Sequence, residues 1–334
     1  MTESTVLSSR VRLARNYEDL PFDAASKPEQ AATCVARTAN AMALSGMDEG
    51  FRLIRLSSLT DVQRRSLAES HLISKDLLKE SATATVLLRQ EDSLSVMMNE
   101  EDHLRIQAIR PGMELLSAAS ACFRVDDALS RHVVFAFDQQ LGYLTACPTN
   151  TGTGMRASLL MHLPMLTLCK QMGNVGQIVA KVGLTIRGVY GEGAEALGNL
   201  YLVSNQVTLG RTEQELISAV TAVGHQLTDM EVSLRSRMLT GSRASLEDTI
   251  YRAWGILTNA RMLSVKEFFQ YWSGVRLGAA MGVLPVEASA VDALLDEGQD
   301  AHLMAYAESA LEGAALNEAR ADRVRELLSK AIGK

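Results

Sequence analysis

Aromatic residues and cysteines are scarce in this chain. Aromatic side chains make up 5% of the 334 residues, whereas methionine occurs 15 times, so we expect a core filled by aliphatic side chains and methionine. The four cysteines are scattered, without a Cys-x-x-Cys pair or a zinc-type Cys/His spacing: Cys34, Cys122, Cys147 and Cys169. We therefore expect neither a disulfide framework nor a protein-bound metal site.

Long uncharged apolar runs are also missing, as is a basic patch ahead of an apolar stretch near residue 1. With a mean hydropathy of +0.04, the chain is expected to have no membrane-spanning helix and no secretory signal, which predicts a cytoplasmic protein. The net charge of −6 repels polyanions, so nucleic acid is not an expected partner. Lysine is scarce too, since 25 of the 33 basic residues are arginine. Whether an arginine cluster indicates a binding site therefore depends on where it lies in the chain.

Apolar spacing predicts strands and helices in the first two thirds of the chain. Residues 6–15 alternate, with Val11 and Leu13 on one side of a predicted strand and Arg10 and Arg12 on the other. The other elements expected before residue 211 are strands over 83–89, 93–99, 102–109, 133–137, 176–188 and 200–208, and helices over 28–45, 60–80, 112–122 and 155–172.

From about residue 211 onward every apolar spacing is helical. Two capping boxes, in residues 212–215 and 264–267, predict the starts of helices. The change from mixed to purely helical spacing near 211–245 predicts a boundary, with a catalytic domain over 1–235 and a helical C-terminal domain over 236–334.

Two charged segments in the mixed part are candidates for a site. Arg10 and Arg12 lie side by side on one strand face, where guanidinium groups repel each other unless an anion or a carboxylate lies between them. A solvated edge strand explains the same pattern. Glu100, Glu101 and Asp102 are three adjacent carboxylates, which also repel one another unless cations share the site. A charged surface turn is the alternative.

Two glycine-containing segments are further candidates. Cys147 precedes a Gly-rich turn and the helix expected over 155–172, so backbone amides and the helix N-terminus can bind an anion and stabilise a thiolate. The phosphate-loop pattern Gly-x-x-x-x-Gly-Lys-Ser/Thr is absent from the sequence. In 187–193, glycines interrupt a strand and leave Glu192 on a loop. A plain strand-to-helix connection and an ordinary surface glutamate are the alternatives.

Together the four segments resemble the phosphagen kinase superfamily, the ATP:guanidino phosphotransferases, and they occur in that family's order. The most specific signature is Cys-Pro-Thr-Asn-Thr-Gly-Thr in residues 147–153. The chain is most similar to the branch of bacterial protein arginine kinases, because no separate helical domain precedes Ser8 and because residues 187–199 look like that branch's glutamate loop. The resemblance implies an α+β fold with an antiparallel sheet flanked by helices, as in phosphagen kinase and glutamine synthetase catalytic domains, plus a helical C-terminal domain.

The resemblance also implies an activity and its site residues. It implies transfer of the γ-phosphoryl group of ATP, with Mg²⁺, to arginine side chains of proteins. Glu101 and Glu192 match the two carboxylates that hold the acceptor guanidinium, with Glu101 as the base, and Cys147 matches a thiolate beside it. His71 matches an adenine contact. The positions that match phosphate-binding residues are all arginines: Arg10, Arg12, Arg105, Arg156 and Arg187.

The resemblance further implies a homodimer and three protein partners: an activator, a heat-shock repressor that serves as substrate, and a Clp ATPase that receives marked proteins for degradation. A kinase of a small guanidino metabolite and a non-catalytic adaptor are the alternatives. The retained carboxylates, cysteine and arginines argue against the adaptor. The branch's C-terminal Arg-Asp-x-x-Arg-Ala motif, which docks phosphoarginine, aligns in no register with residues 318–326, so the resemblance does not extend to that docking site.

Overall fold

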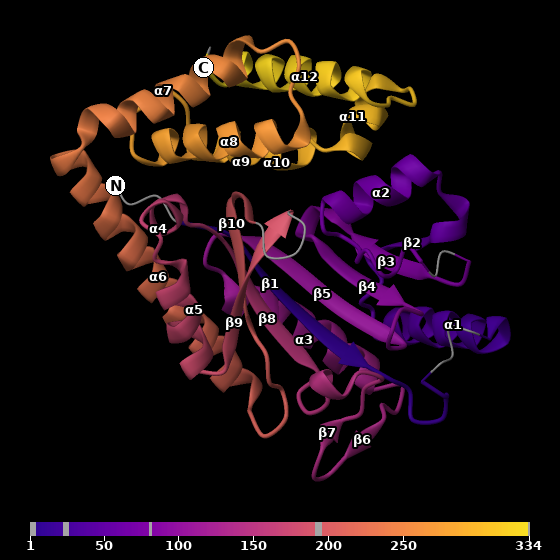
Figure 1. Cartoon of the computed structure of the whole chain (residues 1–334). Coiled ribbons are helices and arrows are strands. Elements are labelled where there is room, and N and C mark those ends of the chain that lie inside the picture. Colours follow the sequence, from indigo (N-terminus) through magenta and orange to yellow (C-terminus); the bar gives the residue numbers. More distant parts are fainter. Residues whose placement is uncertain (1–4, 23–26, 80–81, 191–195, 333–334) are drawn as a thin grey trace.

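One eight-stranded antiparallel sheet organises the chain, as the computed structural model in Figure 1 shows for residues 5–22, 27–79, 82–190 and 196–332. The strand order is β2-β3-β4-β5-β1-β8-β10-β9. The strands are β1 (Val6–Arg15), β2 (Arg52–Arg55), β3 (Thr85–Arg89), β4 (Leu94–Met98), β5 (Leu104–Pro111), β8 (Met155–His162), β9 (Leu184–Tyr190) and β10 (Ala196–Asn205). A short hairpin, β6 (Phe137–Asp138) with β7 (Gly142–Tyr143), lies outside this sheet.

Helices cover one face of the sheet and extend along one end of it (Figure 1). The helices that precede residue 213 are α1 (Pro28–Leu44), α2 (Asp61–Glu69), α3 (Leu115–Ser130), α4 (Pro164–Leu168) and α5 (Met172–Lys181). The later ones are α6 (Glu213–Gly241), α7 (Arg243–Asn259), α8 (Val265–Ala280), α9 (Ala288–Asp292), α10 (Leu294–Glu297), α11 (Asp300–Ala307) and α12 (Ala314–Ile332).

The central strand β1 separates a hydrophobic face of the sheet from a basic one. Val11 and Leu13 are fully buried in the cluster that also contains residues of α3 and α6. Because successive side chains of a strand point to opposite faces, Arg10 and Arg12 project from the other side. The sequence-predicted alternation over 6–15 is therefore confirmed.

The C-terminal helices have their own core, which also includes parts of the sheet layer. Phe268, Phe269 and Trp272 of α8 are buried in this cluster together with Met165 of α4 and Leu200 of β10. The indole Nε1 of Trp272 donates a hydrogen bond to the carbonyl oxygen of Val291 at 2.8 Å. These contacts join the C-terminal helices to the sheet.

Both predicted capping boxes are present. The side chain of Thr212 accepts from the backbone N–H of Glu215, and Ser264 accepts in the same way from Glu267, so these pairs start α6 and α8. The antiparallel sheet, its flanking helices and the helical C-terminal part agree with the expectation. The division at residue 236 stays a prediction, and α6 runs continuously through it.

Four predicted elements are wrong in type or extent. Residues 155–162 form β8 rather than the start of a helix, and the region 176–188 divides into the end of α5 and most of β9. The helix expected over 60–80 ends at Glu69, and of 133–137 only Phe137 belongs to a strand, β6. Met, Leu and Ala favour helices locally, but pairing with β1 and β10 makes 155–162 a strand, because tertiary contacts override weak propensities.

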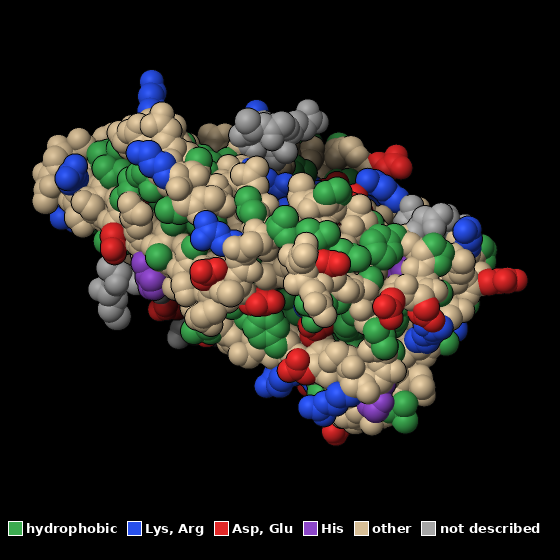
Figure 2. Space-filling view, turned by 90° about the horizontal axis from the view of Figure 1, so that it is seen from below, with side chains coloured by type: hydrophobic (Ala, Val, Ile, Leu, Met, Phe, Trp, Pro, Cys, Tyr) green, Lys and Arg blue, Asp and Glu red, His purple; other side chains and the backbone are tan. Residues whose placement is uncertain are grey.

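None of the helices in the described part of the chain is both long and apolar enough to cross a bilayer. On the face shown in Figure 2, acidic and basic side chains are interspersed among apolar ones.

Candidate active site

A cavity of about 760 Å³ lies on the basic face of the sheet. Arginines from three strands line it: Arg10 and Arg12 from β1, Arg105 from β5 and Arg187 from β9. Arg156 of β8 stands directly opposite Arg12 in the β1–β8 pairing. The five arginines that the sequence singles out, which come from four separate strands, are therefore brought together.

This arginine cluster has more positive charge than its surroundings balance. The Nε atoms of Arg10, Arg12 and Arg156 are buried and have no hydrogen-bond partner among the described residues. Burial, followed by the charge of Arg187, lowers the pKa of Arg10 to about 10. Burial and nearby arginines also lower the pKa of Arg12 and of Arg156. Buried guanidinium donors without acceptors favour a ligand that carries several anionic oxygens.

Glu100 is the buried carboxylate of this site. Its Oε1 accepts a hydrogen bond from Nη1 of Arg105 at 2.6 Å and another from the hydroxyl of Ser74. Its Oε2 is buried without a partner among the described residues. Burial raises the pKa of Glu100, and the charge of Arg105 opposes that shift. The Glu100 carboxylate is therefore held rigidly at the edge of the arginine cluster.

Glu101 and Cys147 are both neighbours of the Arg156 guanidinium. The side chain of Glu101 is 45% exposed, and its Oε2 lies 3.9 Å from Nη2 of Arg105. Burial lowers the pKa of Arg156, and the proximity of Cys147 and Glu101 opposes that shift, so both groups lie close to this guanidinium. Cys147 Sγ also lies 3.1 Å from Oγ1 of Thr149. One carboxylate and the sulfur therefore lie beside the arginine cluster, near Arg105 and Arg156, although neither lines the cavity itself.

Glu192, the second carboxylate expected from the sequence, lies outside the described residues.

A buried hydrogen-bond clamp connects the turn that carries Glu101 to the segment that carries Cys147. Asp102 Oδ1 accepts from the Asn16 side-chain amide and from the backbone N–H of Ala146, both at 2.7 Å. Asn16 Oδ1 in turn accepts from the backbone N–H of His103 at 2.8 Å. This clamp of Asn16 and Asp102 fixes the spacing between Glu101 and Cys147.

Hydrogen bonds from Thr208 hold the segment that follows Cys147. Thr208 donates from Oγ1 to the carbonyl oxygens of Thr149 and Thr151, at 3.0 and 2.6 Å. Gly152 has a φ of +117°, and a Cβ there would lie 2.6 Å from the Thr208 carbonyl oxygen, so only glycine fits this approach. Residues 155–162 form β8, so the α-helix expected there to stabilise the Cys147 thiolate is wrong, and a short 3-10 helix, Pro148–Asn150, follows Cys147 instead.

His71 lines the cavity just beyond the end of α2. Its Nε2 lies 2.8 Å from the hydroxyl of Tyr190, and its backbone adopts a φ of 58°. Burial, then the charges of Arg10 and Lys75, lowers the pKa of His71 to about 4, so the ring is neutral at pH 7. A neutral ring in a cavity wall is suited to contact with a planar uncharged group.

Sequence reasoning assigned no individual role to three members of the site, Glu100, Asn16 and Asp102, although the first and last lie in the acidic run that it singled out. Glu100 and Asp102 adjoin Glu101 in the acidic run, which hides their different roles, because burial separates them only in the folded chain. Asn16 directly follows β1 and is 1% exposed. A polar residue at the end of a buried strand is the one signal that points to it.

The arginines of the C-terminal segment 318–326 are used within the chain. Arg320 is 1% exposed and donates to the carbonyl oxygens of Gly298 and Leu263 as well as to Asp300. Arg323 pairs with Glu297 and Glu326. These side chains have counter-charges or acceptors of their own, unlike those of the cavity.

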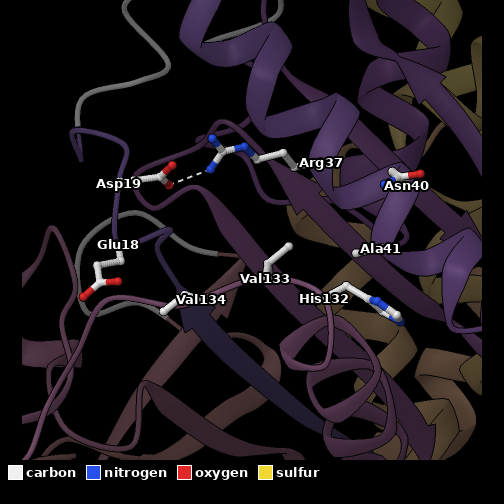
Figure 3. Close-up of a pocket in the computed structure, with 8 residues that line it drawn as sticks. All are labelled: Glu18, Asp19, Arg37, Asn40, Ala41, His132, Val133 and Val134. Atoms are coloured by element: carbon white, nitrogen blue, oxygen red, sulfur yellow. Dashed lines mark hydrogen bonds and ion pairs between the residues drawn. The ribbon is translucent and has the colours of Figure 1, made fainter.

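A second, smaller cavity of about 400 Å³ lies near the end of β1 (Figure 3). Asp19 and Arg37, which form an ion pair at 2.5 Å, line it together with Glu18, Asn40, Ala41, His132, Val133 and Val134. None of the candidate site residues that the structure describes lines it.

Two family models match separate parts of the chain. The model of the ATP:guanido phosphotransferase, C-terminal catalytic domain, matches residues 34–234, well over half of the sequence. This chain belongs to the ATP:guanido phosphotransferase family. A second model, the Protein-arginine kinase McsB C-terminal domain, matches residues 243–333. In this ATP:guanido phosphotransferase, β1 lies ahead of the first match and yet forms the centre of the sheet.

Relatives and a solved structure agree with this membership. A Protein-arginine kinase of Moorella thermoacetica is 44% identical over 97% of this chain and 94% of that protein. A Protein-arginine kinase of Bacillus subtilis is 40% identical over 97% of this chain and 90% of that protein. The crystal structure of Lombricine Kinase matches with a TM-score of 0.59 and 26% identity, covering 69% of this chain and 67% of that chain. The protein is accordingly a kinase of the phosphagen kinase type.

Proposed function

We propose that this protein is a protein-arginine kinase, which transfers the γ-phosphoryl group of ATP to arginine side chains of proteins. The observation that carries the proposal is the cluster of arginines from four strands, whose buried Nε atoms lack acceptors, next to a carboxylate and a thiol. The names of relatives at 40 and 44% identity over 97% of the chain support the choice of acceptor.

The acceptor half of the reaction has to overcome the charge of the substrate. A guanidinium is cationic, delocalised and always protonated in water. In the proposed mechanism Glu101 accepts its N–H donors, orients one nitrogen toward the phosphorus and removes a proton as the N–P bond forms. Glu192 serves as the second carboxylate, and Cys147 as a thiolate adds a third negative contact. Asn16 and Asp102 keep Glu101 and Cys147 at a constant separation.

The donor half depends on positive charge. The loose transition state of phosphoryl transfer spreads negative charge over the migrating oxygens, so fixed cations supply most of the stabilisation. We assign this role to Arg10, Arg12, Arg105, Arg156 and Arg187. The cavity wall at His71 is assigned to the adenine ring, which a neutral imidazole can contact without a charge penalty.

Mg²⁺ fits the site as an ion that arrives on the phosphates. Among the described residues, none of the clusters of carboxylates, histidines and cysteines is dense enough to form a protein-only metal site. The unpartnered Oε2 of buried Glu100 is a suitable single oxygen ligand, directly or through water, because Mg²⁺ commonly takes one or two carboxylates plus phosphate oxygens. When bound, Mg²⁺ would neutralise charge on the phosphates.

Mass spectrometry for acid-labile phosphate on arginine tests the proposed function. The protein is incubated with ATP and Mg²⁺, and either with an arginine-rich unfolded protein such as casein or with free arginine. We expect phosphoarginine on casein. ATP consumption with free arginine alone would make the protein a kinase of a small guanidino compound. If Glu101→Ala left cellular function unchanged, both kinase proposals would be wrong and an adaptor role would take their place.

The proposal includes a cellular setting. The partners are a second copy of the chain, an activator, a heat-shock repressor and a Clp ATPase, and the setting is the cytoplasm. Free thiols support the cytoplasm, since all four cysteines are unpaired, as is usual in a reducing compartment. Co-purification of the tagged chain from its host under heat stress, with and without Glu101→Gln, tests whether these partners depend on phosphorylation.

A further inference from the structure

The arginine-lined cavity has a second wall of a different chemical character. Four apolar side chains from the sheet and the C-terminal helices line it: Leu160, Val189, Leu202 and Leu295. Beside them Asp292 and Asp296 contribute carboxylates. Leu295 and the two aspartates belong to α9 and α10, so the C-terminal helical part of the chain forms one side of the cavity.

This wall is fixed to the catalytic part by a connected set of hydrogen bonds. Glu69, at the end of α2, accepts from the backbone N–H of Ala301 at 3.0 Å and from Nδ1 of His302 at 3.0 Å. Nε2 of His302 lies 3.0 Å from the hydroxyl of Ser70. Burial raises the pKa of Asp296 and the nearby charge of His302 opposes that shift, so Asp296 belongs to the same charged cluster. In Figure 1, α11 lies directly beside α2.

Of the two carboxylates in the wall, Asp296 has acceptor capacity left. Asp292 accepts from Nε and Nη2 of Arg276, at 3.0 and 3.3 Å, and is used by that ion pair. A carboxylate offers about four acceptor positions, and because burial raises the pKa of Asp296, an added hydrogen bond to its charged form is favourable. Asp296 lines the cavity, so its remaining positions are within reach of a ligand there.

The chemistry of this wall selects one part of the nucleotide. Carboxylates repel phosphate oxygens, so the triphosphate belongs with the arginines. Apolar side chains accommodate a planar base, and a carboxylate accepts hydrogen bonds from ribose hydroxyls, the use that dinucleotide-binding proteins make of an acidic residue. A nucleoside triphosphate has both halves in one molecule, as the cavity does.

We propose that the C-terminal helical part completes the nucleotide site, with Leu295 packing against the base and Asp296 accepting a hydrogen bond from a ribose hydroxyl. Asp296 is then a residue that determines specificity for a nucleoside triphosphate over a bare polyphosphate. This inference rests on the proposed function, because it takes ATP as the donor.

Titration calorimetry on the full chain tests the proposal with two probes, ATP and inorganic tripolyphosphate. We expect Asp296→Ala to weaken ATP binding about 10- to 100-fold, the usual value of a hydrogen bond to a charged group, and to leave tripolyphosphate binding unchanged. Glu297→Ala is the matched control, since Glu297 lies in the same helix and pairs with Arg323 rather than lining the cavity. That variant should bind both probes as the wild type does.

Equal weakening of both probes by Asp296→Ala, or unchanged ATP affinity, would overturn the inference. If the alanine variant does not fold, Asp296→Asn keeps the size of the side chain and one acceptor oxygen and should weaken ATP binding alone by about 3- to 10-fold. Phosphoarginine formation is measured in the same wild-type preparation. Its absence there refutes the proposed function, whereas its presence with unchanged ATP affinity in the variant refutes only the role of Asp296.

Discussion

Glu101 combines partial exposure with contact to the arginine cluster, which is what an acceptor-binding base requires. We expect Glu101→Gln to lower kcat for phosphoarginine formation by about 10²- to 10⁴-fold, because the amide cannot remove a proton. ATP affinity should stay the same, as the arginines are untouched. Glu318→Gln, an exposed site far along the chain, is the control and should retain full kcat. Undiminished turnover in Glu101→Gln would remove this residue from the chemistry.

Asn16 is predicted to act by positioning. Asn16→Ala deletes its hydrogen bonds to Asp102 and to the His103 backbone, so we expect a loss of about 1–3 kcal/mol in the free energy of unfolding. Because the Cys147 segment loses part of its anchor, kcat should fall more than the KM for ATP changes. The rate of Cys147 alkylation by iodoacetamide gives a second readout. An unchanged alkylation rate would limit Asn16 to a role in stability.

The junction between α2 and α11 should make stability depend on pH. The hydrogen bond to Glu69 raises the pKa of His302, and the charges of Asp296 and Glu297 act in the same direction. A raised pKa adds stability below the unfolded-state value, about 6.5, and that stability is lost as pH rises through the folded-state value. We therefore expect the free energy of unfolding to decrease between pH 6 and pH 8.

Urea unfolding of the wild type and of His302→Gln, at several pH values across that range, measures the effect. The variant should lack the part of the decrease that His302 contributes, and its curve should be flatter. Parallel curves for the two proteins would assign the pH dependence to other groups.

Among the helices and strands, the sequence correctly predicted those that a strong pattern within a few residues defines. The alternation of β1 and the two capping boxes are of this kind, since both signals lie within a few residues. The segment 155–162 could not be assigned in this way. Its Met, Leu and Ala residues fit a helix equally well, and only hydrogen bonding to β1 and β10 decides in favour of β8. The same error produced the helix N-terminus expected beside Cys147.

For the molecule as a whole, the arginine cluster is predicted to trade stability for ligand binding. Arg12 is desolvated and its Nε has no acceptor among the described residues, and replacing such a charge by an apolar side chain of similar size removes a desolvation penalty. We expect Arg12→Met to raise the free energy of unfolding of the ligand-free protein by about 1–3 kcal/mol and to weaken ATP binding. Thermal unfolding with and without ATP measures both changes. A destabilised ligand-free variant would show that Arg12 is already compensated.

The candidate site is only partly predictable from sequence, because its residues come from distant parts of the chain. Arg10, Arg105, Arg156 and Arg187 lie far apart in the chain, and their convergence depends on a strand order in which β1 lies between β5 and β8. Each segment alone suits a surface strand or turn equally well. The contribution of α10 to the cavity is even harder to predict from sequence, because it depends on how the C-terminal helices pack against α2.

The central position of β1 also constrains how this chain can evolve. A single inserted or deleted residue in β1 would exchange its two faces, moving Arg10 and Arg12 into the apolar layer and Val11 and Leu13 into the cavity. Both pairings, to β5 and to β8, would have to shift together to compensate. We expect natural variation in length to accumulate in the connections between strands, while the ten residues of this strand keep a constant count.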